Sequence, residues 1–120
     1  MKILVCGGRN YADYQEVSEV LDSVIYARFG DYFYDQVMII EGGAKGADRL
    51  GRLFAIARGC GRWTFNADWN KYGKAAGMIR NRRMLEEGKP DIVVAFPGGR
   101  GTEDMIARAR KAKVKVLKIC

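Results

Sequence analysis

Short apolar runs alternate along the whole chain with longer stretches in which apolar residues recur every three or four positions. This alternation is typical of parallel strands joined by covering helices, because a strand buried on both faces is apolar throughout. The predicted strands are Lys2–Cys6, Val37–Glu41, Arg62–Phe65, Ile92–Phe96 and Val114–Ile119. We therefore expect an α/β fold: a three-layer sandwich whose five-stranded, mainly parallel sheet carries helices on both faces.

Four amphipathic stretches are predicted to form the covering helices. The first begins after the N-cap residue Asp13 and ends near Gly30, and the second begins after the glycines that follow residue 41 and ends at Gly59. The third spans about Lys74–Glu87, and the fourth runs from Thr102 to about Lys111. A chain of 120 residues with 48% apolar residues fits one domain over residues 1–120.

The composition excludes several classes of site. The chain has no histidine and three widely spaced cysteines, which argues against a zinc site, a disulfide framework and any triad built on Ser-His or Cys-His. No run approaches ~18 apolar residues, and the start lacks a signal-peptide pattern. We therefore expect a cytoplasmic protein that has no membrane partner.

Glycine-rich turns directly follow three of the predicted strands and are the candidate binding elements. They read CGGR at 6–9, EGGAKGAD at 41–48 and PGGRGT at 97–102. Glycine lets backbone N–H groups approach an anion, and the helix behind each turn adds the positive end of its dipole. Because parallel strands end at one sheet edge, the turns predict a phosphate-sized rim. The residues expected to bind are Gly7, Gly8, Arg9, Gly42, Gly43, Ala44, Lys45, Asp48, Pro97, Gly98, Gly99, Arg100, Gly101 and Thr102.

Neither common nucleotide-binding motif is present. Lys45 is followed by Gly46, so the second turn does not match the Walker pattern, and no strict GxGxxG occurs. Asp48 fits a helix cap as well as an acceptor for a ribose hydroxyl or a ligand amine. Asp68 and Trp69 follow the third strand, where the indole fits either core packing or stacking on a base.

Positive charge is concentrated in two segments. The formal net charge is +7, and the stretch from Trp69 to Leu85 holds five cations without one acid. Six more cations follow Asp104 without an acidic residue. Such a field favours anionic partners, either nucleotide phosphates or nucleic acid.

Four of these motifs in this order resemble the YspA-type, cpYpsA-related branch of the SLOG superfamily. They are GGR at 7–9, GGAKGAD at 42–48, ADWNKYGKAAGMIRNRRM at 67–84 and PDIVVAFPGGRGTEDM at 90–105. The superfamily also contains the Smf/DprA DNA-processing proteins and the LOG phosphoribohydrolases. The resemblance implies a Rossmann-like fold that binds a nucleotide or a nucleotide-derived ligand, in bacteria or their phages.

The LOG enzymes cleave the N-glycosidic bond of nucleoside 5′-monophosphates with a PGGxGTxxE motif and an arginine from RKxxM. By resemblance, Arg80 takes the place of that arginine, and its guanidinium also suits a phosphate clamp. Asn81, which follows it, is expected to bind the ligand as well. The position of the catalytic glutamate is occupied by Met105, which is expected to pack its helix on the sheet. Asp104 is one residue short, about 100° around the helix, so its carboxylate is expected to point elsewhere. Arg80 and Asp104 are nevertheless the candidate catalytic residues.

Three functions stay open at this stage: a nucleotide-binding sensor or sequestering module, a LOG-like nucleotide hydrolase, and a binder of single-stranded nucleic acid. No cofactor is required, and no residues at metal-ligand spacing demand a metal. A divalent ion accompanying a nucleotide would have Asp48 or Asp68 as its ligand. Relatives in which one chain completes the pocket of another imply a homo-oligomer, a dimer or larger.

Overall fold

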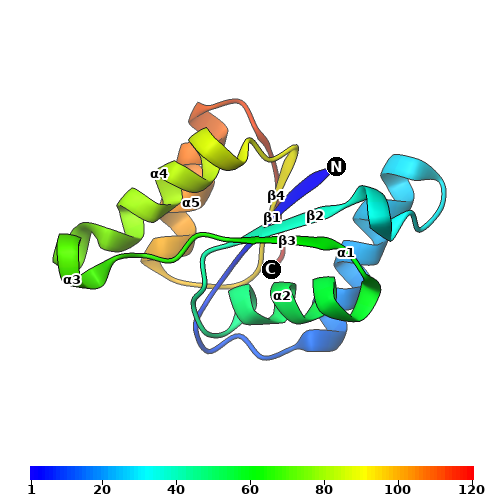
Figure 1. Cartoon of the computed structure of the whole chain (residues 1–120), viewed down its shortest axis with the longest axis horizontal. Coiled ribbons are helices and arrows are strands. Elements are labelled where there is room, and N and C mark those ends of the chain that lie inside the picture. The colour runs from blue at the N-terminus through cyan, green and yellow to red at the C-terminus, as the bar shows by residue number, and fades with distance from the viewer.

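The computed structural model describes all 120 residues and shows one five-stranded sheet with helices on both faces (Figure 1). The strands are β1 (Lys2–Cys6), β2 (Met38–Glu41), β3 (Gly61–Thr64), β4 (Ile92–Ala95) and β5 (Lys115–Lys118). Their order in the sheet is β3-β2-β1-β4-β5, and every neighbouring pair is parallel. The expected three-layer α/β architecture is confirmed, with a sheet that is entirely parallel.

The helices are α1 (Tyr14–Phe29), α2 (Ala47–Arg58), α3 (Trp69–Tyr72), α4 (Ala76–Gly88) and α5 (Arg100–Lys111), with single 3-10 turns η1 (Tyr34–Gln36) and η2 (Gly73–Ala75). The ends of α1 and α2 are as predicted, because Asp13 caps α1 and both helices end at left-handed glycines, Gly30 and Gly59. Neither the length nor the apolar character of any helix suffices for crossing a membrane.

Two helix boundaries differ from the prediction. The third helix, α4, begins at Ala76 because Lys74 belongs to the 3-10 turn η2. The last helix, α5, begins at Arg100, two residues before the expected start at Thr102, and its cap is Gly99. The reason is that Thr102 looks like a capping residue in the sequence, whereas no side chain caps α5 in the structure.

Two apolar layers hold the helices on the sheet. In Figure 1, α1 and α2 lie on one face of the sheet, and α4 and α5 lie on the other. Val17, Leu21 and Ile25, the helical-period residues of α1, are fully buried in the first layer. Met105 of α5 is fully buried in the second layer, so its predicted packing role is confirmed. Each such side chain contributes about 1.5–3 kcal/mol of burial free energy.

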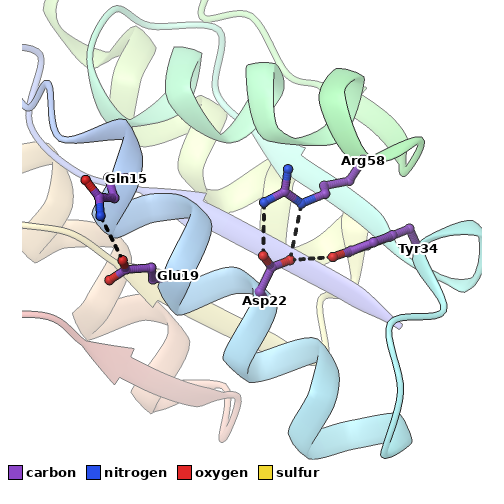
Figure 2. Close-up of polar contacts among 5 residues, drawn as sticks. All are labelled: Gln15, Glu19, Asp22, Tyr34 and Arg58. Carbon is purple, nitrogen blue, oxygen red and sulfur yellow. Dashed lines mark hydrogen bonds and ion pairs between the residues drawn. The ribbon is translucent and has the colours of Figure 1, made fainter.

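A polar cluster links α1, α2 and η1 at the end of the sheet where the strands begin. Asp22 of α1 accepts a hydrogen bond from the Tyr34 hydroxyl (2.8 Å) and forms an ion pair with Arg58 at the end of α2 (3.0 Å), as Figure 2 shows. Tyr34 and Arg58 therefore tie η1 and α2 to the same carboxylate. Gln15 and Glu19, also drawn there, pair along an exposed turn of α1 (3.1 Å).

The strand order creates a crevice at the other end of the sheet. From central β1 the chain builds β2 and β3 on one side, and it then crosses to place β4 and β5 on the other. The connections after β1 and β4 therefore leave toward opposite faces, since one leads to α1 and the other to α5. Parallel α/β sheets bind ligands at such a reversal of strand order.

Candidate functional site

A cleft of about 660 Å³ lies at this reversal of strand order. The end of β1, the start of α2, the α3–η2 segment, α4 and the start of α5 all contribute to its walls. The lining residues are Cys6, Gly7, Gly8, Arg9, Ala44, Asp48, Trp69, Lys74, Gly77, Met78, Arg80, Asn81, Met84, Gly99, Arg100, Gly101, Thr102 and Asp104. Its volume lies within the usual range for small-molecule sites, about 300–1,000 Å³.

The first and third glycine turns pack directly against each other. The Gly8 N–H donates to the Pro97 carbonyl at 2.8 Å. A Cβ on Gly98 would lie 2.6 Å from the Gly8 nitrogen and 2.2 Å from the Thr102 hydroxyl oxygen. Gly8 and Gly98 are therefore required by the close approach of two backbones, whereas a Cβ on Gly99 or Gly101 would meet open space.

The second glycine turn is closed by the protein's own carboxylates. Asp48 Oδ2 accepts the N–H groups of Gly42 and Ala44, each at 3.2 Å, and Glu41 Oε1 accepts that of Gly43 at 2.7 Å. These three N–H groups are thus already paired within the protein and are not free to donate to an anion, although Ala44 and Asp48 line the cleft. Lys45 and Gly43 are exposed and lie outside the cleft.

The start of α5 provides the unpaired donors of the cleft. No side chain caps the helix at Gly99, and its first backbone hydrogen bond runs from Glu103 N–H to the Gly99 carbonyl (3.0 Å). The N–H groups of residues 100–102 therefore precede the first intrahelical donor. Thr102 is 6% exposed and its hydroxyl forms no hydrogen bond with the protein. This combination of free donors and helix dipole is suited to an anion.

Arg80 and Asp48 form the buried wall of the cleft. Arg80 donates through Nη1 to the Gly42 carbonyl and through Nε to Asn81 Oδ1 (3.1 Å), and burial lowers its pKa. Burial raises the pKa of Asp48 to about 6, although the Ala44 N–H and the Arg80 charge oppose that shift. Asp48 is thus a carboxyl group that changes its charge near neutral pH.

Asn81 connects α4 to the start of α5. Its Nδ2 donates to the Gly101 carbonyl (3.1 Å) and to Asp104 Oδ2 (3.0 Å), and the same oxygen of Asp104 pairs with Arg108 Nε (2.9 Å). The expectation that Asp104 points away from the site is wrong, because it lines the cleft. One of its carboxylate oxygens is, however, occupied by two donors.

The mouth of the cleft carries an exposed aromatic side chain and a cation. The Arg9 guanidinium lies 5.7 Å from the centre of the Trp69 ring, whose residue is 49% exposed. Core packing of Trp69 is therefore excluded. Asp68 caps the short helix α3 by accepting the Lys71 N–H at 3.0 Å and does not line the cleft.

The structure gathers most, but not all, of the predicted site. Six predicted residues lie outside the cleft lining: Gly42, Gly43, Lys45, Asp68, Pro97 and Gly98. Five lining residues were not predicted: Cys6, Lys74, Gly77, Met78 and Met84. Each of the five lay inside a motif that the sequence had marked: Cys6 in the CGGR turn, and the other four in the stretch at 67–84.

Two further features limit the chemistry of the cleft. Burial raises the pKa of the Cys6 thiol to about 12, so it is not a nucleophile at neutral pH. No group of three or more Cys, Asp or Glu side chains comes together in an arrangement that could hold a metal ion.

Comparison with known proteins places the chain in a family. A family model described as YspA, cpYpsA-related SLOG family matches residues 1–72, which include β1, the second glycine turn and Trp69. The Gene 61 protein of Mycobacterium phage D29 is similar as well, with 32% identity over 126 residues that cover 97% of this chain and 94% of the relative. No solved structure gives a significant match. On the family match and the full-length relative together, the chain belongs to the YspA, cpYpsA-related SLOG family.

Proposed function

We propose that the protein binds a nucleotide or a nucleotide-derived ligand in this cleft, with a phosphate at the start of α5. The observation that carries the proposal is the uncapped helix start beside the unpaired hydroxyl of buried Thr102. A phosphate there accepts hydrogen bonds from backbone N–H groups and from the hydroxyl, and the helix dipole favours its charge.

The rest of the cleft fits a nucleoside. Trp69 offers an indole face at the cleft mouth, and stacking of a base on an aromatic ring contributes about 1–3 kcal/mol. Family membership supports the same ligand class, because it suggests that the protein binds or processes a nucleotide-related molecule. A sensor or sequestering role requires only this binding.

Calorimetry with nucleoside phosphates tests the proposal. Gly99→Asp places a carboxylate at the start of α5, where a Cβ has no neighbour within 4 Å, so the fold survives and binding is lost. Ala107→Asp is the matched control, since it adds the same charge to an exposed position of α5 outside the cleft and leaves binding intact. Equal affinity of the Gly99→Asp variant and the unmodified protein would refute the site. Mass spectrometry of small molecules released from purified protein identifies the ligand directly.

Hydrolysis of the glycosidic bond is the second candidate, and the position of Asp104 in the cleft favours it. An oxocarbenium-like transition state needs a nearby carboxylate, and Asp104 has one oxygen that accepts no hydrogen bond from the protein. Incubation with nucleoside monophosphates at high protein concentration, followed by detection of free base, decides this candidate. If the unmodified protein releases no free base, hydrolysis is excluded. If the Asp104→Asn variant releases free base as fast as the unmodified protein, Asp104 is not the catalytic residue.

A further inference from the structure

We propose that the cleft selects ligands with two or more linked phosphates over monophosphates, with the second phosphate held by Arg9 and Lys74. This inference rests on the proposed function, because it assigns the first phosphate to the start of α5. It goes further in naming the class of ligand, a nucleoside diphosphate unit, whatever its base.

Three cations of the cleft have no acidic partner. Arg9 comes from the turn after β1, Lys74 from η2 and Arg100 from the first residue of α5. The protein forms four ion pairs, and none of them includes these three side chains. All three are exposed along the cleft, so their charges are available to a ligand.

The acids of the cleft leave this charge largely uncompensated. Asp104 is paired with Arg108, with 2.9 Å between Oδ2 and Nε. Once that pair is set aside, Asp48 is the remaining acid of the lining, and its charge acts on Arg80, the fourth lining cation. Asp48 is itself turned to the glycine turn, whose N–H groups it accepts, and it is 6% exposed.

One phosphate cannot use all of these groups. A phosphate monoester carries a charge of about −1.5 to −2 at neutral pH, and the free donors and Arg100 at the start of α5 already suffice for it. Arg9 and Lys74 belong to separate segments of the cleft wall, and the Arg9 guanidinium lies 5.7 Å from the centre of the Trp69 ring. A second phosphate supplies the negative charge with which Arg9 and Lys74 can pair.

Paired nucleotides test the inference without knowledge of the base. Calorimetry in EDTA compares AMP with ADP, GMP with GDP, CMP with CDP and UMP with UDP. For the base that binds, we expect the diphosphate to bind at least about tenfold more tightly, or about 1.4 kcal/mol, because Arg9 and Lys74 add charge-assisted contacts to its second phosphate. Arg9→Gln and Lys74→Gln each lower the affinity of the diphosphate more than that of the monophosphate, so the preference shrinks.

Arg83 of α4 provides the control for Arg9 and Lys74. Arg83→Gln removes an exposed cation of α4 that is paired with Glu87 outside the cleft, and it leaves the preference unchanged. Equal affinity for mono- and diphosphates overturns this inference while the proposed function stands. A preference that survives in both Arg9→Gln and Lys74→Gln overturns the assignment of the second phosphate to these residues. Binding of none of the eight nucleotides refutes the proposed function and the inference together.

Discussion

The Asn81 side-chain amide donates a hydrogen bond to Asp104, with 3.0 Å between Nδ2 and Oδ2, and so joins α4 to α5 beside the cleft. Asn81 is 4% exposed, and it also donates to the Gly101 carbonyl and accepts from Arg80 Nε. A single buried amide therefore fixes both the start of α5 and the guanidinium of Arg80. Buried amides that satisfy several partners are difficult to replace.

Asn81→Leu is expected to lower the free energy of unfolding by about 2–3 kcal/mol, because it removes one donor from the Gly101 carbonyl, one donor from Asp104 and the acceptor of Arg80 Nε. Urea unfolding followed by circular dichroism measures the loss. Arg82→Leu, at the exposed neighbouring position, is the control and changes stability by less than about 0.5 kcal/mol. Equal losses in the two variants would show that the Asn81 contacts contribute nothing to stability.

Two glycines of the third turn are expected to respond oppositely to an added methyl group. Gly98→Ala places a Cβ against the Gly8 nitrogen and the Thr102 hydroxyl, so overpacking costs about 1–3 kcal/mol. Gly101→Ala puts its methyl into open space inside α5 and raises stability by about 0.5–1 kcal/mol. Thermal or urea unfolding compares both with the unmodified protein. A Gly98→Ala variant as stable as Gly101→Ala would contradict the packing of the two turns.

The sequence was sufficient to predict the architecture because each element of it is a local pattern. The apolar runs of β1 and β4 predicted strands buried on both faces, and Val17, Leu21 and Ile25 predicted the buried side of α1. The short helix α3 was missed because four residues cannot display a helical period. Its only local signals are the cap at Asp68 and the stop at Gly73.

The site was predictable in place but not in detail. Parallel strands bring the glycine turns to one edge, so the position of the cleft followed from the order of strands and turns. Which N–H groups stay unpaired depends on contacts between segments distant in sequence, such as that of Gly8 with Pro97. The same holds for the inward direction of Glu41, a charged residue at the end of an apolar strand. Sequence periodicity carries no information on such contacts.

Asp48 is expected to make the protein less stable as pH rises from about 4 to about 7. Its pKa is raised from 3.8 to about 6 by burial, so between these values the folded state holds a proton that the unfolded state has released. Stability therefore falls with rising pH through this window and levels off above the folded pKa. The change is on the order of 2–3 kcal/mol.

Asp48→Asn isolates this contribution, because an amide keeps an oxygen acceptor for the Gly42 and Ala44 N–H groups and does not titrate. Urea unfolding at pH 4.5 and at pH 7 measures both proteins, and the unmodified protein loses more stability than the variant between these pH values. Parallel pH profiles for the two proteins would mean that Asp48 is not the titrating group.

The chain has two tryptophans, and only Trp69 lines the cleft. Trp63 lies on the edge strand β3, where its ring packs 4.7 Å from that of Phe65. Nucleotide binding is therefore expected to change the fluorescence of a Trp63→Phe variant, which reports on Trp69 alone. The measurement is a titration with the nucleotide that binds most tightly in the calorimetric panel.

Trp69→Phe is the reciprocal variant, and its remaining signal from Trp63 should not respond to nucleotide. Because phenylalanine keeps a smaller aromatic face, we expect calorimetry to detect binding weakened by about 1 kcal/mol, or roughly fivefold. A Trp69→Phe variant that still binds nucleotide but shows no fluorescence change has therefore lost the reporting indole and not the binding site. A fluorescence change in Trp69→Phe equal to that in Trp63→Phe would place the base elsewhere than on Trp69.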